Sequence, residues 1–240
     1  MAVDKCRALR QHLRLFKPEE LQLLDEENVE WLPRLRSIHP SYIVQHIISA
    51  VRAFETEAER LQRTAWIRCW LMPFDNQLTW ALYSAAKIPA LHECTEALTR
   101  MASLLKRITE DASEAPQACI VRGSAVYACL MAEVELNQPV ERYAVYVCMW
   151  TTQPLLAVNC ACRIAQRIQY ILQIAIRSDI QRIGEVRGSP EVAWKTALST
   201  LSKFPAEPKG QRYTTADQQP RENLAVGSHV EQLSSVLGTT

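Results

Sequence analysis

The chain has 240 residues, of which 48% are hydrophobic, enough for one large domain or two small ones with a packed core. Its 27 basic and 26 acidic residues leave a formal net charge of +1, which excludes a strong overall basic field. The charge is nevertheless uneven, because residues 1–17 hold five bases and one acid, whereas residues 18–30 hold six acids and no base. A basic segment of this kind is typical either of a patch that binds anions or of an ordinary solvated helix face.

Eight cysteines are present, and most lie inside apolar segments, where cysteine is usually a small buried hydrophobe. Charged residues from Asp4 to Arg10 interrupt any apolar run at the start of the chain, so we expect no signal peptide and a reducing compartment with free thiols. Cys119, Cys129 and Cys148 are predicted to be reduced core thiols. No uncharged run reaches the roughly 18 residues of a membrane span, so any membrane association is expected to be peripheral.

Helical signals open the chain. Residues 3–16 place leucines on one side of a helix and arginines elsewhere. Residues 17–20 (KPEE) are typical of a helix start, with proline in the first turn and acids near the positive end of the helix dipole. Another start follows at residues 39–41 (HPS), before apolar residues at helical spacing, and Thr56 is predicted to cap the helix after it.

The centre of the chain is rich in small and apolar residues. Residues 123–131 and 144–150 show no sustained alternation with period two, so we predict helices there and place residues 118–152 at the centre of a helical core. Beyond Pro154, residues 155–183 carry isoleucines at spacings of three and four, which predicts one face of a long helix.

Further helices are predicted at residues 78–86, at residues 91–109 and from Val192 to Leu201. The sequence therefore predicts an all-α fold, a bundle of roughly ten helices with a disordered C-terminal tail. We divide it into an N-terminal helical subdomain, a middle helical subdomain, a C-terminal helical segment and the tail, at residues 1–88, 89–152, 153–204 and 205–240.

Patterns typical of catalytic and metal sites are nearly absent from the sequence. The six glycines form no phosphate-binding loop, and no nucleophile elbow or metal-binding histidine pair occurs. Cys160 and Cys162, and His92 beside Cys94, are the best metal candidates. On a helix, however, the thiols of a Cys-x-Cys pair point about 200° apart, which suits one metal ion badly. We therefore expect no metal, no cofactor and no enzymatic activity.

Four short patches between residues 30 and 150 are informative through their order and spacing. They are Glu30-Trp31-Leu32, Glu59-Arg60-Leu61-Gln62-Arg63, Leu105-Lys106-Arg107-Ile108, and Gly123 to Met131 followed by Val147-Cys148. In order, spacing and expected helical layout, the chain resembles the matrix proteins of influenza-like viruses (orthomyxoviruses). The arginine-rich patch is thinner here, since Ala65 and Trp66 follow Arg63. Thr151 stands where the family has a second cysteine, so the family's zinc site is not carried over.

The resemblance implies a structural viral matrix protein that self-assembles beneath the envelope. It would bind anionic membrane and the viral ribonucleoprotein or RNA, and it could meet a nuclear-export partner. It would be found in the virion and, in the host cell, in the cytoplasm, in the nucleus and at the inner face of the plasma membrane.

Two groups of candidate site residues follow. The first is a set of basic residues that share helix faces and match the family's basic patches, predicted to bind the membrane or the ribonucleoprotein: Arg60, Arg63, Arg100, Lys106 and Arg107. The second is the apolar stripe of the long predicted helix, proposed as a self-association surface, with an ordinary intramolecular core as the alternative: Ile164, Ile168, Ile171, Ile176, Ile180 and Ile183.

Two other classes of function stay open at this point. A helical adaptor or effector would bind a protein partner through the amphipathic helix at residues 155–183. An enzyme with an unfamiliar site would show turnover of a substrate. Polymerisation together with liposome binding favours the matrix protein, whereas a stoichiometric complex with one protein favours the adaptor.

Overall fold

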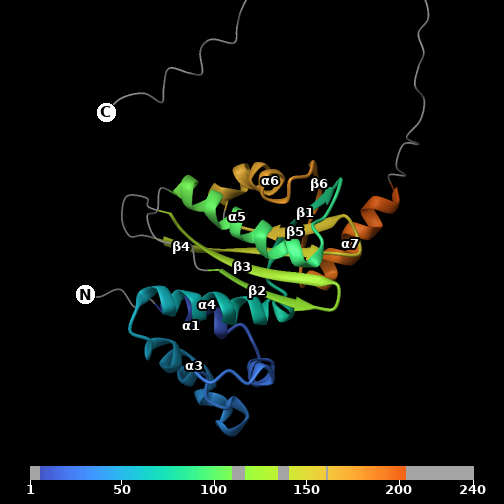
Figure 1. Ribbon diagram of the computed structural model, residues 1–240. Coiled ribbons are helices and arrows are strands. Elements are labelled where there is room, and N and C mark those ends of the chain that lie inside the picture. The colour runs from blue at the N-terminus through green and yellow to red at the C-terminus, as the bar shows by residue number, and fades with distance from the viewer. Residues whose placement is uncertain (1–5, 110–116, 135–140, 161, 204–240) are drawn as a thin grey trace, which may run out of the picture. The chain divides into compact units, whose positions relative to one another are not determined.

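Both strands and helices are present in the computed structural model, which describes residues 6–109, 117–134, 141–160 and 162–203 (Figure 1). Seven α-helices and a six-stranded sheet lie within these residues. The prediction of an all-α bundle of about ten helices was therefore wrong, and the fold is mixed α/β. The predicted disordered tail at residues 205–240 lies outside the described residues.

The N-terminal layer consists of short helices around their own apolar core. Leu9 and Leu13 of one helix and Ile43 and Ile47 of another are buried together in it. Asp25 fixes the connection between two turns, because its carboxylate accepts backbone hydrogen bonds from Leu35 and Arg36, both at 2.8 Å. The α-helices of this layer are α1 (Arg7–Leu13), α2 (Pro18–Gln22) and α3 (Ile43–Arg52), with 3-10 turns at Leu23–Glu27, Leu35–Ser37 and Pro40–Tyr42.

Helix α4 (Glu57–Leu71) lies between this layer and the sheet, and a 3-10 turn follows it at Met72–Phe74. Its N-terminus confirms the predicted cap, since the Thr56 hydroxyl accepts a hydrogen bond from the backbone N–H of Glu59. One side of α4 packs in the N-terminal core through residues such as Trp70. The other side packs on the sheet through Ala65 and Cys69.

The sheet is antiparallel in every pairing, with the strand order β2-β3-β4-β5-β1-β6. Strand β1 is the first of the six in the sequence, yet it lies between β5 and β6. A two-residue turn joins β2 to β3, and Gly123 adopts a φ of 59° there, a conformation that glycine tolerates. The strands are β1 (Thr79–Ala85), β2 (Gln117–Arg122), β3 (Ala125–Val134), β4 (Glu141–Trp150), β5 (Leu155–Asn159) and β6 (Ile180–Arg187).

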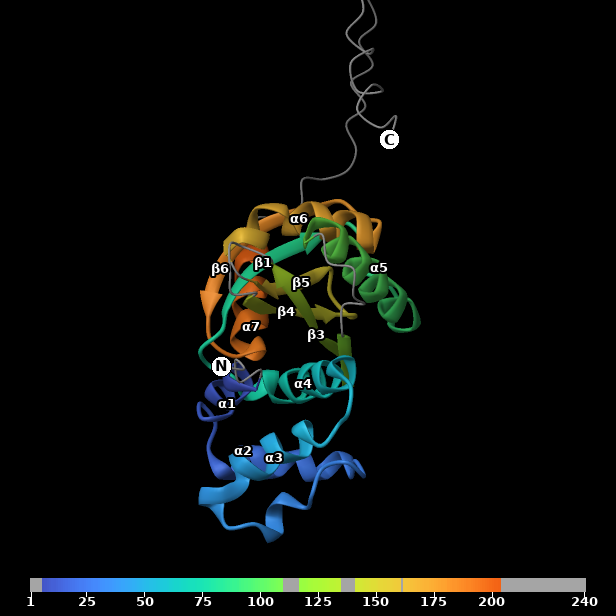
Figure 2. The ribbon, with the colours of Figure 1, turned by 90° about the vertical axis from the view of Figure 1, so that its left-hand side faces the viewer.

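Helices cover both faces of the sheet (Figures 1 and 2). Helices α5 (Leu91–Thr109) and α6 (Cys162–Ile176) pack on one face, and α4 and α7 (Pro190–Lys203) pack on the other. Alternate residues of each strand therefore enter different cores. In β3, for example, Ala128 contributes to the core under α5 and α6, and Cys129 to the core under α4 and α7.

This two-sided burial explains why the central strands were predicted as helices. A strand with one wet face alternates between apolar and polar residues, but a strand buried on both faces is apolar almost throughout. Residues 125–131 and 145–150 are buried or nearly so at every position, so no alternation with period two is visible. The predicted helix at residues 78–86 is likewise strand β1, with both faces covered.

The predicted long helix at residues 155–183 is three elements. Strand β5 comes first, then α6, and the chain turns at Arg177 and Ser178 before β6. Helix α5 agrees with the helix predicted at residues 91–109. Strands from all three predicted helical segments, residues 1–88, 89–152 and 153–204, pair within the one sheet. No helix among the described residues is long and apolar enough to cross a membrane.

Candidate anion-binding site

A polar groove lies between α1 and α3 in the N-terminal layer, with a volume of about 530 Å³. Arg10 and Arg14 line it from α1, and Arg52 lines it at the end of α3. Hydrogen-bonding side chains from α3 and from the 3-10 turn before it complete this wall, and two apolar side chains of α3 contribute to the lining: Ser41, Gln45 and Ser49, with Val44 and Ile48.

Helix periodicity places these side chains. Leu9 and Leu13 are buried against the N-terminal core, so Arg10 and Arg14, one position further along α1, lie at its border. On α3 the buried residues Ile43, Ile47 and Val51 face the same core, which turns the polar residues of the helix outward. The groove is therefore a consequence of two amphipathic helices that pack through their apolar faces.

The groove is basic. Three of its eight lining residues are arginines, and no aspartate or glutamate is among these eight. Arg14 is exposed and makes no ion pair with a described residue. A guanidinium group offers five N–H donors in a planar fork that matches the oxygen atoms of phosphate. The arrangement can therefore bind a phosphate group from two sides.

A buried polar cluster lies beneath α1 and ties it to the rest of the chain. Arg68 of α4 donates hydrogen bonds to the Tyr146 hydroxyl of β4 at 2.8 Å and to the Ala8 carbonyl at 3.3 Å. His12 Nδ1 lies 3.8 Å from Asp75 Oδ2, and both side chains are buried. Burial, together with the charge of Arg68, lowers the pKa of His12 to about 3, so this imidazole is neutral near pH 7.

Asp75 has the opposite perturbation, because burial raises the pKa of its carboxyl group although the backbone N–H of Gln77 donates to it. The cluster contains a histidine, an aspartate and a tyrosine, and two of its buried nitrogen atoms, His12 Nε2 and Arg68 Nε, have no hydrogen-bond partner among the described residues. Its effect is to hold α1, and so one wall of the groove, at a fixed place.

The predicted basic residues of α4 are occupied by internal contacts. Arg60 donates to the carbonyl groups of Phe54 and Glu55, at 2.7 and 3.0 Å. The guanidinium of Arg63 lies 5.3 Å from the ring centre of Trp31 and 5.0 Å from that of Phe54, a cation–π arrangement. These two arginines stabilise the joint between α4 and the N-terminal layer.

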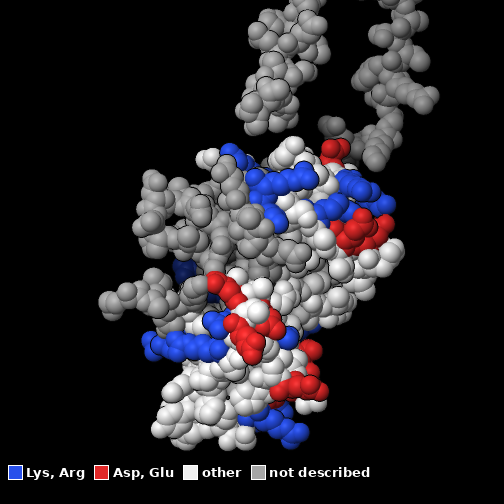
Figure 3. Space-filling model, turned by 60° about the vertical axis from the view of Figure 1, so that its left-hand side comes forward, with Lys and Arg blue, Asp and Glu red and all other residues white. Residues whose placement is uncertain are grey.

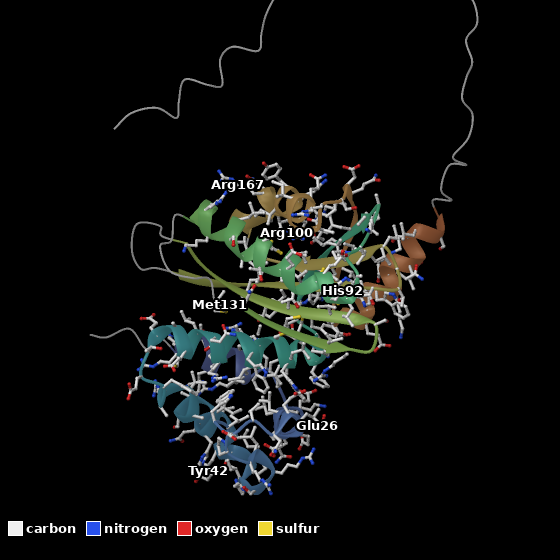
Figure 4. The ribbon with its side chains drawn as sticks, viewed as in Figure 1. Glu26, Tyr42, His92, Arg100, Met131 and Arg167 are labelled. Carbon is white, nitrogen blue, oxygen red and sulfur yellow. The ribbon has the colours of Figure 1, made fainter. Side chains whose placement is uncertain are left out.

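The other three predicted basic residues lie on α5, on the opposite face of the sheet from α4. Arg100 pairs with Glu96 and donates to the Ala175 carbonyl of α6 at 2.9 Å (Figure 4). Lys106 is half-buried, and Arg107 is exposed. The structure therefore separates the five residues into two groups. In Figure 3 the lysine and arginine side chains likewise form separate groups, with acidic side chains beside them.

The isoleucine stripe is mostly buried within the chain. Ile168, Ile171, Ile176 and Ile180 are at most 8% exposed, in the core under α5 and α6. Ile183 lies on β6 and is half-buried, and the side chain of Ile164 lies outside the described residues. This burial favours the intramolecular core, which was the alternative to self-association.

The described cysteines are free, and their burial differs from the prediction at one position. Cys129 and Cys148 are buried, as predicted, and burial raises the pKa of both thiols, to about 12 for Cys129. The prediction was wrong for Cys119, which is exposed on the edge strand β2. Among the described residues, no group of three histidine, cysteine or acidic side chains is placed to bind a metal ion.

The sequence contained part of the signal for the groove. Arg10 and Arg14 are four residues apart, so they share one face of the predicted first helix. Ser41, Gln45 and Ser49 were not singled out, because serine and glutamine on a helix are ordinary surface residues. Only the packing of α3 against α1 brings them opposite the arginines.

Comparison with known proteins assigns no family. No protein-family model matches the chain. No curated protein matches it either. The resemblance to orthomyxovirus matrix proteins thus rests on its short patches. The fourth of these patches, residues 123–131 with residues 147–148, lies in the turn before β3, in β3 and in β4, so the helical layout that the resemblance implies is wrong for this chain.

Proposed function

We propose that this chain is a non-catalytic binding protein that holds the phosphate backbone of a nucleic acid in the groove between α1 and α3. The observation that carries the proposal is the lining of the groove, in which Arg10 and Arg14 stand opposite Arg52 and hydroxyl and amide side chains, without an acid among the lining residues. Arginine, serine and glutamine are typical donors to phosphate and sugar oxygens.

The shape of the site favours a chain of phosphates over a membrane. Lipid headgroups form a broad surface, which would meet the rim of a concave site before its walls. A phosphate backbone is narrow enough to lie between two helices. From Gln45 to Arg52 the α3 wall extends about 10 Å, at 1.5 Å per residue. That length corresponds to about three nucleotides, since one strand advances 3.4 Å per nucleotide.

Three such contacts give modest, salt-dependent binding. Each neutralised phosphate contributes a slope of about −0.9 to the dependence of log K on log salt concentration. Three contacts therefore predict a loss of about 40-fold in affinity between 50 and 200 mM salt. We assign the lining residues to phosphate and sugar contacts and none of them to the edge of a base, so we expect binding with little dependence on base sequence.

Among the partners that the matrix resemblance implies, the groove supports the ribonucleoprotein or RNA. Assembly beneath an envelope and binding of anionic lipid have no comparable support, because the five basic residues proposed for them lie on two helices that cover opposite faces of the sheet. We therefore keep nucleic-acid binding and leave virion assembly as an expectation of the short sequence patches.

Fluorescence anisotropy with a labelled DNA duplex, a labelled RNA duplex and the full chain tests the proposal. The combined variant Arg10→Gln, Arg14→Gln, Arg52→Gln should lose nearly all affinity at 50 mM salt, and any residual binding should show a salt slope smaller by two to three, about 0.9 per arginine. Circular dichroism and thermal unfolding establish that the variant is folded.

The matched control removes the same charge elsewhere. Arg34→Gln, Arg36→Gln, Arg182→Gln changes three exposed arginines, none of which lines the groove. It should retain affinity within about threefold, since none of these arginines lines the groove and so none makes the proposed phosphate contacts. Equal losses of affinity in the two triple variants would refute the proposal that the nucleic acid binds in the groove. Tight binding of the wild type to phosphatidylserine vesicles but not to either duplex would show that the partner of the groove is a membrane and not a nucleic acid.

A further inference from the structure

Helix α6 has an outer face that is apolar at its centre. Tyr170 is 64% exposed and Ile174 is 38% exposed, whereas Ile171 and Ala175 of the same helix are buried in the core. Tyr170 and Ile174 are four residues apart, so they form one continuous patch along the helix. Covering two adjacent apolar side chains removes their surface from water, which favours the binding of a partner at this face.

The patch continues into a hollow of about 570 Å³ at the C-terminal end of α6. Besides Tyr170 and Ile174, the lining includes Gln173 and Arg177 from the helix region and Lys87 from the loop after β1.

Hydrogen bonds hold the rim of this hollow in place. The backbone N–H of Ala86 donates to the Asp179 carbonyl at 2.9 Å, and that of Lys87 donates to the Ser178 hydroxyl at 2.9 Å. The N–H of Ser178 in turn donates to the Gln173 carbonyl, which closes the end of α6. The two segments that form the rim are therefore joined before any partner arrives, and less ordering is needed on binding.

The charge around the patch is mainly positive. Helix α6 contains no acidic residue between Cys162 and Ile176. Arg167, which is labelled in Figure 4, is three residues before Tyr170, and Arg177 directly follows the helix, three residues after Ile174. Neither arginine forms an ion pair with a described residue.

Acids near the hollow offset this charge only in part. Asp179 is the one acid in its described lining. On the neighbouring helix α5, Glu93 is close enough to be influenced by the charge of Lys87. The patch thus has arginines at both ends of an apolar centre and an additional lysine at the side.

Arg177 adopts a backbone conformation that disfavours a side chain. Its φ of 57° lies in the left-handed region, where glycine is the usual residue at the end of a helix. An arginine at this point directs a guanidinium toward the hollow at a cost in stability. Strain of this kind is common at binding sites.

We infer that the outer face of α6 and its hollow form a docking site for an acidic amphipathic helix of another protein. Two apolar anchors one turn apart would pack on Tyr170 and Ile174, the arrangement by which helices dock on apolar surfaces. Aspartate or glutamate on both sides of the anchors would meet Arg167 and Arg177. A nucleic acid fits this site poorly, because its phosphates have no apolar group to cover Ile174. The inference is independent of the α1–α3 groove.

Selection from a yeast-displayed library of single-helix peptides with randomised faces tests this inference, with the full chain as the labelled bait. We expect enriched peptides to carry two large apolar residues three or four positions apart, with acidic residues on both sides. Ile174→Glu should weaken an enriched peptide at least about tenfold, because it places a charge at the centre of the contact. Arg177→Gly should weaken it a few-fold while removing the backbone strain.

A control at a distant surface separates docking from general effects. Val192 on α7 is 41% exposed, close to the 38% of Ile174, so Val192→Glu makes a comparable change elsewhere. It should leave peptide affinity within about twofold. Failure to enrich any peptide, enrichment of basic peptides, or equal binding by the Ile174→Glu variant would each overturn the inference. Two further results would also overturn it. One is a wild-type dimer in sedimentation that Ile174→Glu abolishes, and the other is flotation of the wild type with phosphatidylserine vesicles that Ile174→Glu abolishes.

Discussion

The groove between α1 and α3 and the hollow beside α6 have similar volumes, about 530 and 570 Å³, but opposite chemistry. The groove combines three arginines with hydroxyl and amide groups. The hollow combines the apolar surface of Tyr170 and Ile174 with charged residues of both signs, which include Arg177 and Asp179. Binding in the groove therefore depends on charge, whereas binding at α6 depends mainly on apolar surface removed from water.

Different interactions hold the two sites in place. The groove wall formed by α1 is anchored by a buried cluster that contains the titratable groups of His12 and Asp75. The hollow is held by hydrogen bonds from backbone groups and the Ser178 hydroxyl, none of which titrates in the ordinary pH range. Acid, salt and a change of backbone strain should accordingly affect the two sites unequally.

The largest expected effect is that of acid on the N-terminal layer. The folded-state pKa of His12 is about 3 and its ordinary value is 6.5, so only the unfolded chain takes up this proton between those values. Stability therefore falls as the pH is lowered from 6.5 toward 3, by up to about 1.4 kcal/mol per pH unit. At pH 5 the loss from this group approaches about 2 kcal/mol, measurable by urea unfolding.

Asp75 acts in the opposite direction and reduces the net loss. Its raised pKa means that the folded state retains a proton that the unfolded state has released, which favours folding at low pH and is lost as the pH rises. His12→Gln removes the titrating imidazole and should flatten the dependence between pH 7 and 5. The same slope in His12→Gln and in the wild type would mean that the pKa of His12 is equal in the folded and unfolded states, so that burial does not lower it.

Salt should distinguish the two sites next. Raising salt from 50 to 200 mM is expected to weaken duplex binding by about 40-fold, the value for three phosphate contacts. An acidic peptide bound at α6 should lose only a few-fold, because its apolar contacts are insensitive to screening. Anisotropy titrations of both probes on one preparation measure this difference. Parallel salt slopes would remove the distinction between a charged groove and an apolar hollow.

The smallest expected effect concerns the end of α6. Glycine relieves the left-handed conformation of Arg177 but adds flexibility to the unfolded chain, so Arg177→Gly should stabilise the fold by about 0.5–1 kcal/mol. Thermal unfolding should show a small rise in midpoint, while duplex binding in the groove stays unchanged. Arg177→Ala is the matched control, since it removes the same guanidinium and keeps the strain. A fall in stability on Arg177→Gly would show that the side chain stabilises the turn.

Sequence patterns predicted those helices that have one wet face. Helix α5 and the Thr56 cap of α4 were recognised because a polar face and a capping residue are local signals. Strands β3 and β4 could not be recognised in the same way. Their alternation is between two apolar cores, as Ala128 and Cys129 illustrate, and side-chain polarity cannot distinguish one core from the other.

The candidate sites were predictable to a smaller degree. The spacing of Arg10 and Arg14 and the polarity of residues 1–17 were visible, but the wall provided by α3 depends on tertiary packing. The internal contacts of Arg60, Arg63 and Arg100 were also invisible, because an arginine that binds a carbonyl or stacks on a ring has the same sequence signature as an exposed one.

The position of β1 between β5 and β6 has a consequence for synthesis on the ribosome. Both neighbours of β1 are encoded downstream, and the last residue of β6, Arg187, follows the end of β1 by about 100 residues. At 5–20 residues per second, that interval lasts about 5–20 s. Throughout this interval, the edge of β1 that pairs with β6 has no partner, whereas most of the N-terminal core is already complete. The nascent chain therefore has a period in which chaperones or aggregation compete for β1. The number of residues that must be synthesised before this period ends is set by the order of the strands.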